Sequence, residues 1–425
     1  MHVLIFNQFF TTNDVPGSGR AYELGRGLLN QGDSVTYVTG DSIYLTGKKT
    51  GGGRLLWSRE KVDGIEVIYV TIPFGGSRRI PLRILSSLWF IPFGLLAALR
   101  VRSPDIVVAS SAPLSIGLPG YMLSRLRGIP FVFELRDLWP DAVVDWNLVR
   151  SRLLLWAAYR LESFLYRKAR AIIALSEGIR QEVIAKGIPA SKVSVITNAA
   201  NLELFCPEGS RADLSAKAGV PHDAFVCFYN GSLVWGNALG LIIEAAAELR
   251  ERRDIHFVFL GAGPYRDTLL TEVARQKLES AHFLDPVPKS QVPAFLRAAQ
   301  VGFLLVEPGS LSHVFLPNKF FDYLACGCPI VVNFDGEACQ HLVSSNAGIY
   351  VPPNNAGAIA DVIRDLSASP QKVRQMGENA RRLAESAFGW NHKVVEFREL
   401  LSSLLNHAPG TFVDETPAPD VQSRR

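Results

Sequence analysis

The chain has 425 residues, of which 48% are hydrophobic and 20% are charged, and its formal net charge is +4. This length exceeds what one compact core ordinarily serves, so two domains are expected. The mild charge and the apolar composition are typical of a globular protein and do not indicate one that binds nucleic acid. The five cysteines lack zinc-ligand spacing. They predict free thiols in a reducing cytosol and no metal site.

The first part of the chain alternates apolar strands with helices. Strands are predicted at 2–6, 35–38, 65–71, 106–110, 131–134 and 171–175. In the first helix Leu24, Leu28 and Leu29 recur at helical spacing, and Gly32 ends it. The chain enters its first strand at His2 without a basic and apolar leader, so we expect a cytoplasmic protein. Alternating strands and helices predict a parallel, Rossmann-like sheet.

The loop between the first strand and the first helix contains Gly17 and Gly19. Glycines there let the backbone approach a ligand, and the helix start offers free N–H groups to an anion. The loop lacks the Lys-Ser/Thr ending of a phosphate-binding Walker loop, and Tyr22 stands where a dinucleotide fingerprint needs its third glycine. A tight turn without a ligand is the alternative.

A long apolar segment, 84–99, lies between arginines. It is shorter than the about 20 residues of a spanning helix, and Pro92 interrupts it. Together with its flanks (78–102), and with the similar segment 148–170, it predicts a contact with the inner face of the plasma membrane. The aromatic residues assigned to this contact are Trp89, Phe90 and Phe93. The alternative is a core-facing helix whose arginines extend to solvent.

The apolar strand at 131–134 runs into the polar sequence of Glu134, Arg136 and Asp137. Open α/β sheets bind ligands at the carboxyl ends of their strands, so a substrate hydroxyl is expected to bond Glu134 or Asp137. A purely structural contact of Arg136 with either carboxylate is the alternative.

The second part repeats the alternation. Strands are predicted at 225–229, 256–260, 282–284, 301–306, 330–332 and 349–351. A polar stretch rich in turn-forming residues, 206–222, marks the boundary. We therefore expect a first domain over 1–205 and a second, also Rossmann-like, over 206–389. Residues 407–425 lack periodicity and predict a disordered tail.

Two glycine loops follow strands of the second domain. One contains Gly231, and the other contains Gly261 and Gly263 with Arg266 soon after. Arg266 either faces a phosphate or is solvated. Farther along, Lys319 and Asp322 share one face of a short helix between two strands. A cation at a helix start suits a phosphate, and a carboxylate one turn deeper can accept hydrogen bonds from a ribose diol. An ordinary surface helix is the alternative.

Taken in order, these segments resemble the family 4 glycosyltransferases, whose two-domain architecture is called GT-B. The stretch FVFELRDLWPDAV at 131–143 resembles the branch of bacterial fucosamine and colanic-acid transferases. The resemblance implies an α/β protein with two Rossmann-like domains facing a central cleft, and a last helix, 390–406, that crosses back onto the first domain. It also implies a retaining enzyme that transfers a hexosyl or N-acetylhexosaminyl group from a nucleotide sugar, UDP-linked by family habit.

The resemblance assigns the donor to the second domain and the acceptor, a saccharide or lipid-linked saccharide of bacterial polysaccharide or glycolipid synthesis, to the first. The resemblance assigns the contact with the donor ribose to Asp322. It assigns the cation at the departing diphosphate to Lys319. Ser232 and Asn237 stand where many members have an arginine and a lysine that clamp the diphosphate, so both are expected at the diphosphate. Val314 stands where the first of two glutamates is usual. The chain has no D-x-D motif, so no divalent metal or other cofactor is expected.

Other functions fit parts of the pattern. A dinucleotide-dependent oxidoreductase would share two Rossmann-like domains, but it needs the missing glycine fingerprint. A nucleotide-sugar epimerase of GT-B type shares the whole architecture. A non-catalytic sugar-binding subunit of a membrane assembly would tolerate the absent glutamate and phosphate-binding cations.

Overall fold

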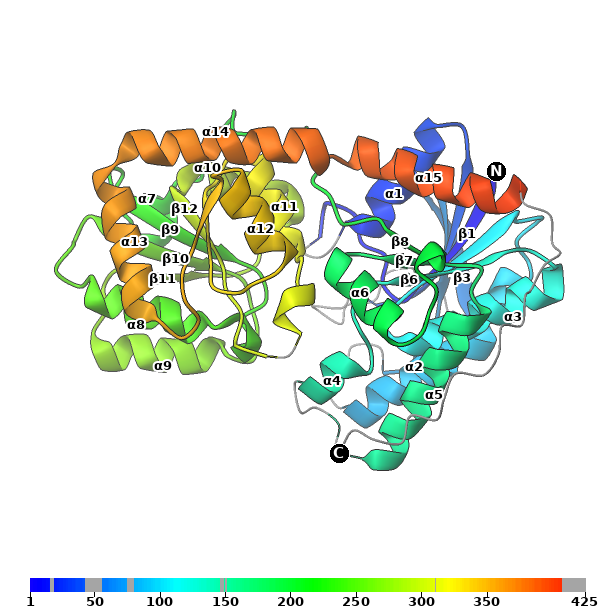
Figure 1. Ribbon diagram of the computed structural model, residues 1–425. Helices are drawn as coiled ribbons and strands as arrows, with labels where there is room; N and C mark the ends of the chain where they lie inside the picture. The colour runs from blue at the N-terminus through cyan, green and yellow to red at the C-terminus, as the bar shows by residue number, and fades with distance from the viewer. Residues whose placement is uncertain are drawn as a thin grey trace.

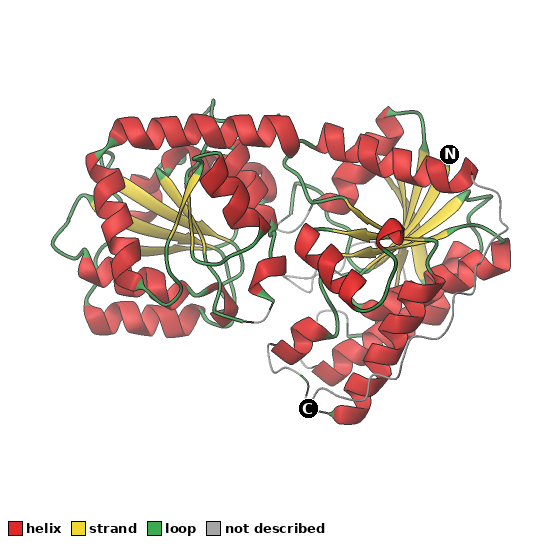
Figure 2. Ribbon diagram, in the orientation of Figure 1, coloured by secondary structure: helices red, strands yellow, loops and turns green. Residues whose placement is uncertain are grey.

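The computed structural model describes residues 1–15, 19–42, 56–74, 80–145, 149, 151–309 and 311–406. Two α/β halves lie next to each other, each with a central sheet covered by helices (Figures 1 and 2). Helices α14 (Pro370–Ala387) and α15 (Trp390–Asn406) run along one edge of both halves (Figure 1). The fold is therefore the predicted pair of Rossmann-like units.

The N-terminal half contains an eight-stranded sheet in the order β3-β4-β2-β1-β5-β6-β7-β8. Its strands are β1 (His2–Asn7), β2 (Ser34–Gly40), β3 (Trp57–Val62), β4 (Ile65–Val70), β5 (Ile106–Ser110), β6 (Phe131–Leu135), β7 (Ala171–Ala174) and β8 (Val193–Val195). All neighbours pair in parallel except β3 with β4. Its helices are α1 (Arg20–Asn30), α2 (Ile80–Ala98), η1 (Leu114–Ile116), α3 (Gly117–Arg127), α4 (Asp141–Asp145), α5 (Arg152–Lys168), α6 (Glu177–Ala185) and η2 (Ala190–Lys192).

The sequence pattern did not predict strand β3. It is a half-exposed edge strand with little apolar character, joined to β4 by a tight turn in which Asp63 and Gly64 have φ of +47° and +90°. An Asp-Gly pair is a strong hairpin signal, so this element was open to prediction. Pro92 lies inside the continuous helix α2, so it does not interrupt the helix as the sequence suggested.

The C-terminal half contains a six-stranded parallel sheet in the order β11-β10-β9-β12-β13-β14. Its strands are β9 (Phe225–Asn230), β10 (Ile255–Leu260), β11 (Ala281–Leu284), β12 (Val301–Leu304), β13 (Ile330–Val332) and β14 (Gly348–Tyr350). Its helices before α14 are α7 (Leu214–Ala218), η3 (Trp235–Asn237), α8 (Leu239–Glu248), α9 (Arg266–Gln276), η4 (Lys289–Gln291), α10 (Val292–Ala298), η5 (Ser312–Val314), α11 (Asn318–Ala325), α12 (Glu337–Ser344) and α13 (Ala356–Ala368). Apolar side chains are buried on both faces, as parallel sheets require.

The last helix, α15, packs against α1 in the N-terminal half. A side chain at Gly27 would place its Cβ 2.3 Å from Val394 Cγ2, so glycine is what allows this approach. Arg398 Nε also donates to Asp33 Oδ2 at 2.6 Å. The limits proposed for the two domains, 1–205 and 206–389, remain predictions, and the tail 407–425 lies outside the described residues.

The cysteines are free, as predicted, and four of the five are buried. Within the described ranges, no helix combines the length and apolar character needed to cross a membrane.

Candidate functional site

The loop that follows β9 meets the start of α11 through Tyr229. Lys319 Nζ donates to Tyr229 Oη at 3.0 Å and lies 4.1 Å from the centre of that ring. Tyr229 Oη donates to Ser232 O at 2.8 Å, and Asn237 Nδ2 donates to both of these oxygens, also at 2.8 Å. The structure therefore brings together Lys319, Ser232 and Asn237, which the sequence placed at the diphosphate.

The ammonium group of Lys319 has no carboxylate partner among the described residues. Loss of hydration against the Tyr229 ring lowers the pKa of Lys319 to about 7, from an ordinary value of 10.5. An anion placed beside this ammonium group would restore its charge. The site is thus built to gain from a bound phosphate.

Three glycines allow the loops after β9 and β10 to cross. A Cβ on Gly261 would lie 1.9 Å from Gly231 O, and one on Gly263 would lie 2.1 Å from Leu233 O. Gly231 itself has φ of +134°, and a Cβ there would lie 3.6 Å from Lys319 Nζ. Any larger residue at Gly261 or Gly263 would push the first loop away. The glycines therefore set the position of the backbone beside Lys319.

Arg266 is the first residue of α9, at the rim of the same loops. Its Nη2 atom lies 3.4 Å from Oδ1 of the exposed Asp285, whereas its Nε is buried without a hydrogen-bond partner in the described structure. Arg266 is thus held by a weak surface pair and has a donor available. Its assignment to a phosphate stays a prediction.

Asp322 is buried, with 6% of its surface exposed. Its Oδ1 lies 3.4 Å from Lys289 Nζ, in an ion pair whose geometry falls short of a hydrogen bond. Burial raises the pKa of Asp322, Lys289 opposes this, and the nearby Glu23 of α1 adds to it. A poorly satisfied buried carboxylate is suited to accept hydroxyl groups. No sequence pattern pointed to Lys289, because its contact with Asp322 depends on the fold.

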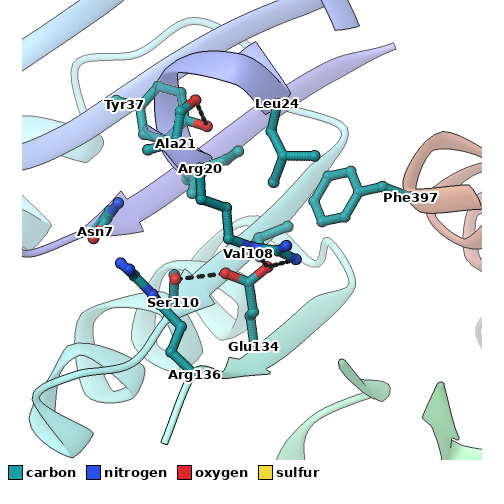
Figure 3. A pocket seen from close by; sticks show the side chains of 11 residues that line it. Asn7, Arg20, Ala21, Leu24, Tyr37, Val108, Ser110, Glu134, Arg136 and Phe397 are labelled. Atoms are coloured by element: carbon teal, nitrogen blue, oxygen red, sulfur yellow. Dashed lines mark hydrogen bonds and ion pairs between the residues drawn. The ribbon is translucent and has the colours of Figure 1, made fainter. Parts of the chain in front are cut away.

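On the N-terminal side, Glu134 at the end of β6 is bonded to neighbouring side chains of the same half (Figure 3). Arg20 donates to Glu134 Oε2 from Nη2 at 2.8 Å and from Nε at 3.1 Å. Ser110 Oγ donates to Oε1 at 2.6 Å. Burial alone would raise the pKa of Glu134, but Arg20 and Ser110 outweigh it and hold that pKa below its usual value.

The partner of Glu134 was missed by the sequence reasoning, which considered only Arg136. A carboxylate at the end of an apolar strand needs a cation, and Arg20 directly follows the glycine loop. Arg20 also donates to Thr197 O at 2.7 Å. Glu134 therefore fixes the start of α1, and its role as a direct substrate ligand stays a prediction.

Asp137, in contrast, is exposed just beyond β6 and is available to a ligand. Gly19 precedes α1, and its Cβ position would lie 3.1 Å from Asn13 Oδ1, a buried acceptor without a hydrogen-bond partner in the described structure. Gly17 lies outside the described residues. The N-terminal contribution to the site therefore rests on Asp137 and the segment around Gly19.

Val314, at the position of the usual first glutamate, faces away from the donor loops. Its side chain is 9% exposed and belongs to the core of the N-terminal half, and its carbonyl accepts from Ser176 Oγ at 2.9 Å. Glu307 reaches the loops instead, since its backbone N–H donates to Gly236 O at 3.0 Å. Burial, and then the neighbouring Glu244, raises the pKa of Glu307. Glu307 is thus the carboxylate that the backbone brings beside this glycine loop.

No cluster of three or more histidine, cysteine or carboxylate side chains suited to a metal occurs in the described ranges. The expectation that no divalent metal is required remains a prediction.

Two family models match the chain and together span most of it. The model described as "Glycosyl transferase 4-like domain" matches residues 17–199, and that described as "Glycosyl transferases group 1" matches residues 210–383. D-inositol 3-phosphate glycosyltransferase 1 of Catenulispora acidiphila is 26% identical over 79% of this chain and 80% of its own. Alpha-D-kanosaminyltransferase of Streptomyces kanamyceticus is 26% identical over 63% of this chain and 69% of its own.

Solved structures of similar fold cover nearly the whole chain. Sucrose-phosphate synthase from Thermosynechococcus elongatus is similar with a TM-score of 0.74 and 17% identity, over 95% of this chain and 98% of that one. Anabaena HepE in complex with UDP and glucose is similar with a TM-score of 0.71 and 19% identity, over 94% and 99% of the two chains. This chain belongs to the family 4 glycosyltransferases of GT-B architecture.

Proposed function

We propose that the protein is a retaining glycosyltransferase that moves a hexosyl or N-acetylhexosaminyl group from a UDP-sugar to a saccharide or lipid-linked saccharide. The observation that carries the proposal is the Lys319 ammonium group, held over Tyr229 beside Gly231 without an ion-pair partner among the described residues. A site of this kind needs an anion, and the departing diphosphate of a nucleotide sugar supplies one.

Charge on the leaving group determines the roles of the donor residues. As the glycosidic bond stretches, negative charge grows on the diphosphate, and one fixed donor is typically worth about 3 kcal/mol to such a transition state. Lys319 supplies the cation, and the start of α1 after Gly19 supplies backbone N–H groups, because the N–H of Gly231 already donates to Leu260 O at 3.0 Å. With the ribose on Asp322, the nucleotide lies along α11. These groups take the place of a metal ion in our proposal.

The N-terminal half receives the acceptor. Asp137 is the exposed carboxylate nearest the end of β6, and Glu134 holds the segment around Gly19 through Arg20. We place the enzyme in bacterial polysaccharide or glycolipid synthesis, within the branch suggested by the RDLWP sequence, in the cytoplasm at the inner face of the plasma membrane. UDP is proposed because HepE was solved with UDP and glucose.

A panel of nucleotide diphosphates and nucleotide sugars, measured by thermal shift, tests the proposal. A ligand at 100 times its Kd stabilises a protein by about 2.7 kcal/mol, so the correct nucleotide raises Tm measurably. We expect UDP and a UDP-sugar to stabilise the wild type and to lose this effect in Lys319→Met. Stabilisation by NADH alone, or an unchanged response of Lys319→Met, would contradict the proposal.

A further inference from the structure

Exposed apolar side chains concentrate on three helices of the N-terminal half. Of the 20 large apolar side chains exposed in the described structure, 12 belong to α2, α3 and α5. They are Ile84, Leu85, Leu88, Trp89, Leu96, Met122, Leu126, Leu153, Leu154, Trp156, Tyr159 and Phe164. The helices α2 and α5 both pack against α3 and η1, so their exposed residues form one region, which we call the apolar surface. Monomeric proteins rarely leave so many apolar groups uncovered in one region.

Part of this surface corrects the sequence prediction. Phe90 was expected to meet lipid, but it is 1% exposed and packs in the core, and Phe93 is only partly exposed and stacks on Trp89 with ring centres 4.5 Å apart. The most exposed residues of this surface are Leu153 (73%) and Trp156 (61%) in the first turns of α5 and Leu126 (63%) in α3. Because a helix of 3.6-residue period has only one side facing the core, Phe90 and Trp89 must differ in this way.

The charges on these helices have one sign. The exposed charged side chains of α2, α3 and α5 are all basic, namely Arg83, Arg125, Arg127, Arg152, Arg160, Arg167 and Lys168. Glu162 is the one acidic residue of the three helices, and it is buried and bonded to Lys186. A surface that is apolar, aromatic and purely basic complements an anionic bilayer, in which tryptophan and tyrosine favour the interface.

The apolar surface adjoins the acceptor side of the site. Tyr159 of α5 donates to Asp141 Oδ1 at 2.9 Å, and Asp141 begins α4 just after the RDLWP sequence. At the other end of α4, Asp145 Oδ2 lies 2.8 Å from where a Cβ on Gly309 would be, in the loop before η5 of the C-terminal half. In Figure 1, α2, α4 and α5 gather on the side of the N-terminal half away from α15. A bilayer on this surface would thus lie next to the acceptor segment.

We infer that α2, α3 and α5 form a docking surface for an anionic lipid bilayer. The first turns of α5 enter the headgroup region through Leu153 and Trp156, and the surrounding arginines contact lipid phosphates. This inference rests on the proposed function and deepens its placement at the inner face of the plasma membrane. Lipid binding is measured without a nucleotide, so its failure is distinct from a failure of sugar transfer.

Co-sedimentation of the full-length protein with vesicles tests the inference. The vesicles are phosphatidylcholine alone or phosphatidylcholine with phosphatidylglycerol. We expect binding to the anionic vesicles that weakens with added salt. The double variant Arg152→Gln/Arg160→Gln should lose about 25-fold in affinity, since each basic residue near the surface contributes about fivefold. Leu153→Ser/Trp156→Ser should lose at least about tenfold.

A matched control pair changes exposed residues of the other half, Leu270→Ser on α9 and Arg374→Gln on α14. This variant should bind vesicles as the wild type does, and all variants should keep the wild-type nucleotide response. Failure to bind anionic vesicles, or binding that the α5 variants leave unchanged, would overturn the inference. A dimer that Leu153→Ser/Trp156→Ser separates, without vesicle binding, would overturn it in favour of contact between copies of the chain.

Discussion

Binding of a nucleotide diphosphate is expected to draw a proton onto Lys319. The pKa of Lys319 in the free protein is lowered to about 7, because its ammonium group is poorly hydrated against Tyr229. A phosphate beside it favours the charged form and returns the pKa towards the ordinary lysine value. Above pH 7 the free side chain is mostly neutral, so the complex must take up a proton that the free protein lacks.

The size of the effect follows from the two pKa values. At pH 8 the free amine is about one-tenth protonated, so binding takes up about 0.9 proton. If the charged form is needed, Kd should rise about 25-fold between pH 7.5 and pH 9. The affinity for the nucleotide diphosphate should therefore fall as pH rises.

Isothermal titration calorimetry in two buffers of different ionisation enthalpy measures this uptake. Lys319→Arg is the control, because a guanidinium stays protonated throughout the range. Its binding should show no proton uptake and a nearly flat Kd. Wild-type binding at pH 8 without proton uptake would contradict this prediction, because the bound phosphate would then not contact Lys319.

Three further changes probe the neighbouring residues. Asp322→Ala should raise the donor KM by about tenfold with a smaller change in kcat, because a ribose contact exists before and during reaction; steady-state kinetics that showed only a kcat loss would exclude the contact. Glu134→Ala leaves Arg20 buried without its carboxylate and should cost about 3–5 kcal/mol in urea unfolding. Since the pKa of Glu134 is lowered in the folded state, this stabilisation holds above the ordinary glutamate pKa and is lost as pH falls through the folded value, so the variant and the wild type should converge in acid. Gly261→Ala would meet Gly231 O and should weaken nucleotide binding at least about tenfold in the same calorimetric assay, whereas wild-type affinity would show that the loop shifts freely.

Sequence patterns predicted the parts of this molecule that depend on local periodicity. Buried parallel strands are continuous apolar runs, so both sheets and most of their strands were readable. The edge strand β3 was missed because its exposed, polar sequence lacks such a run, although the Asp63-Gly64 turn marked it.

The residues of the candidate site likewise fall into those that local sequence patterns predicted and those that they did not. The glycine loops and the helix with Lys319 and Asp322 were found because their residues are close in sequence and follow strands. Tyr229, Lys289 and Arg20 were missed because each meets its partner across a long sequence separation, for example Arg20 with Glu134. The structural role of Glu134 was missed for the same reason, since its distant cation Arg20 is not visible in the local pattern, and its role as a direct substrate ligand stays a prediction.

Every role proposed above requires a nucleotide diphosphate to bind between the two halves, against the glycine loops and Lys319. A crystal structure of the complex with UDP measures this directly. We predict a phosphate oxygen within hydrogen-bond distance of Lys319 Nζ and the ribose hydroxyls on Asp322. A diphosphate bound elsewhere, with Lys319 still held only by Tyr229, would contradict the claim.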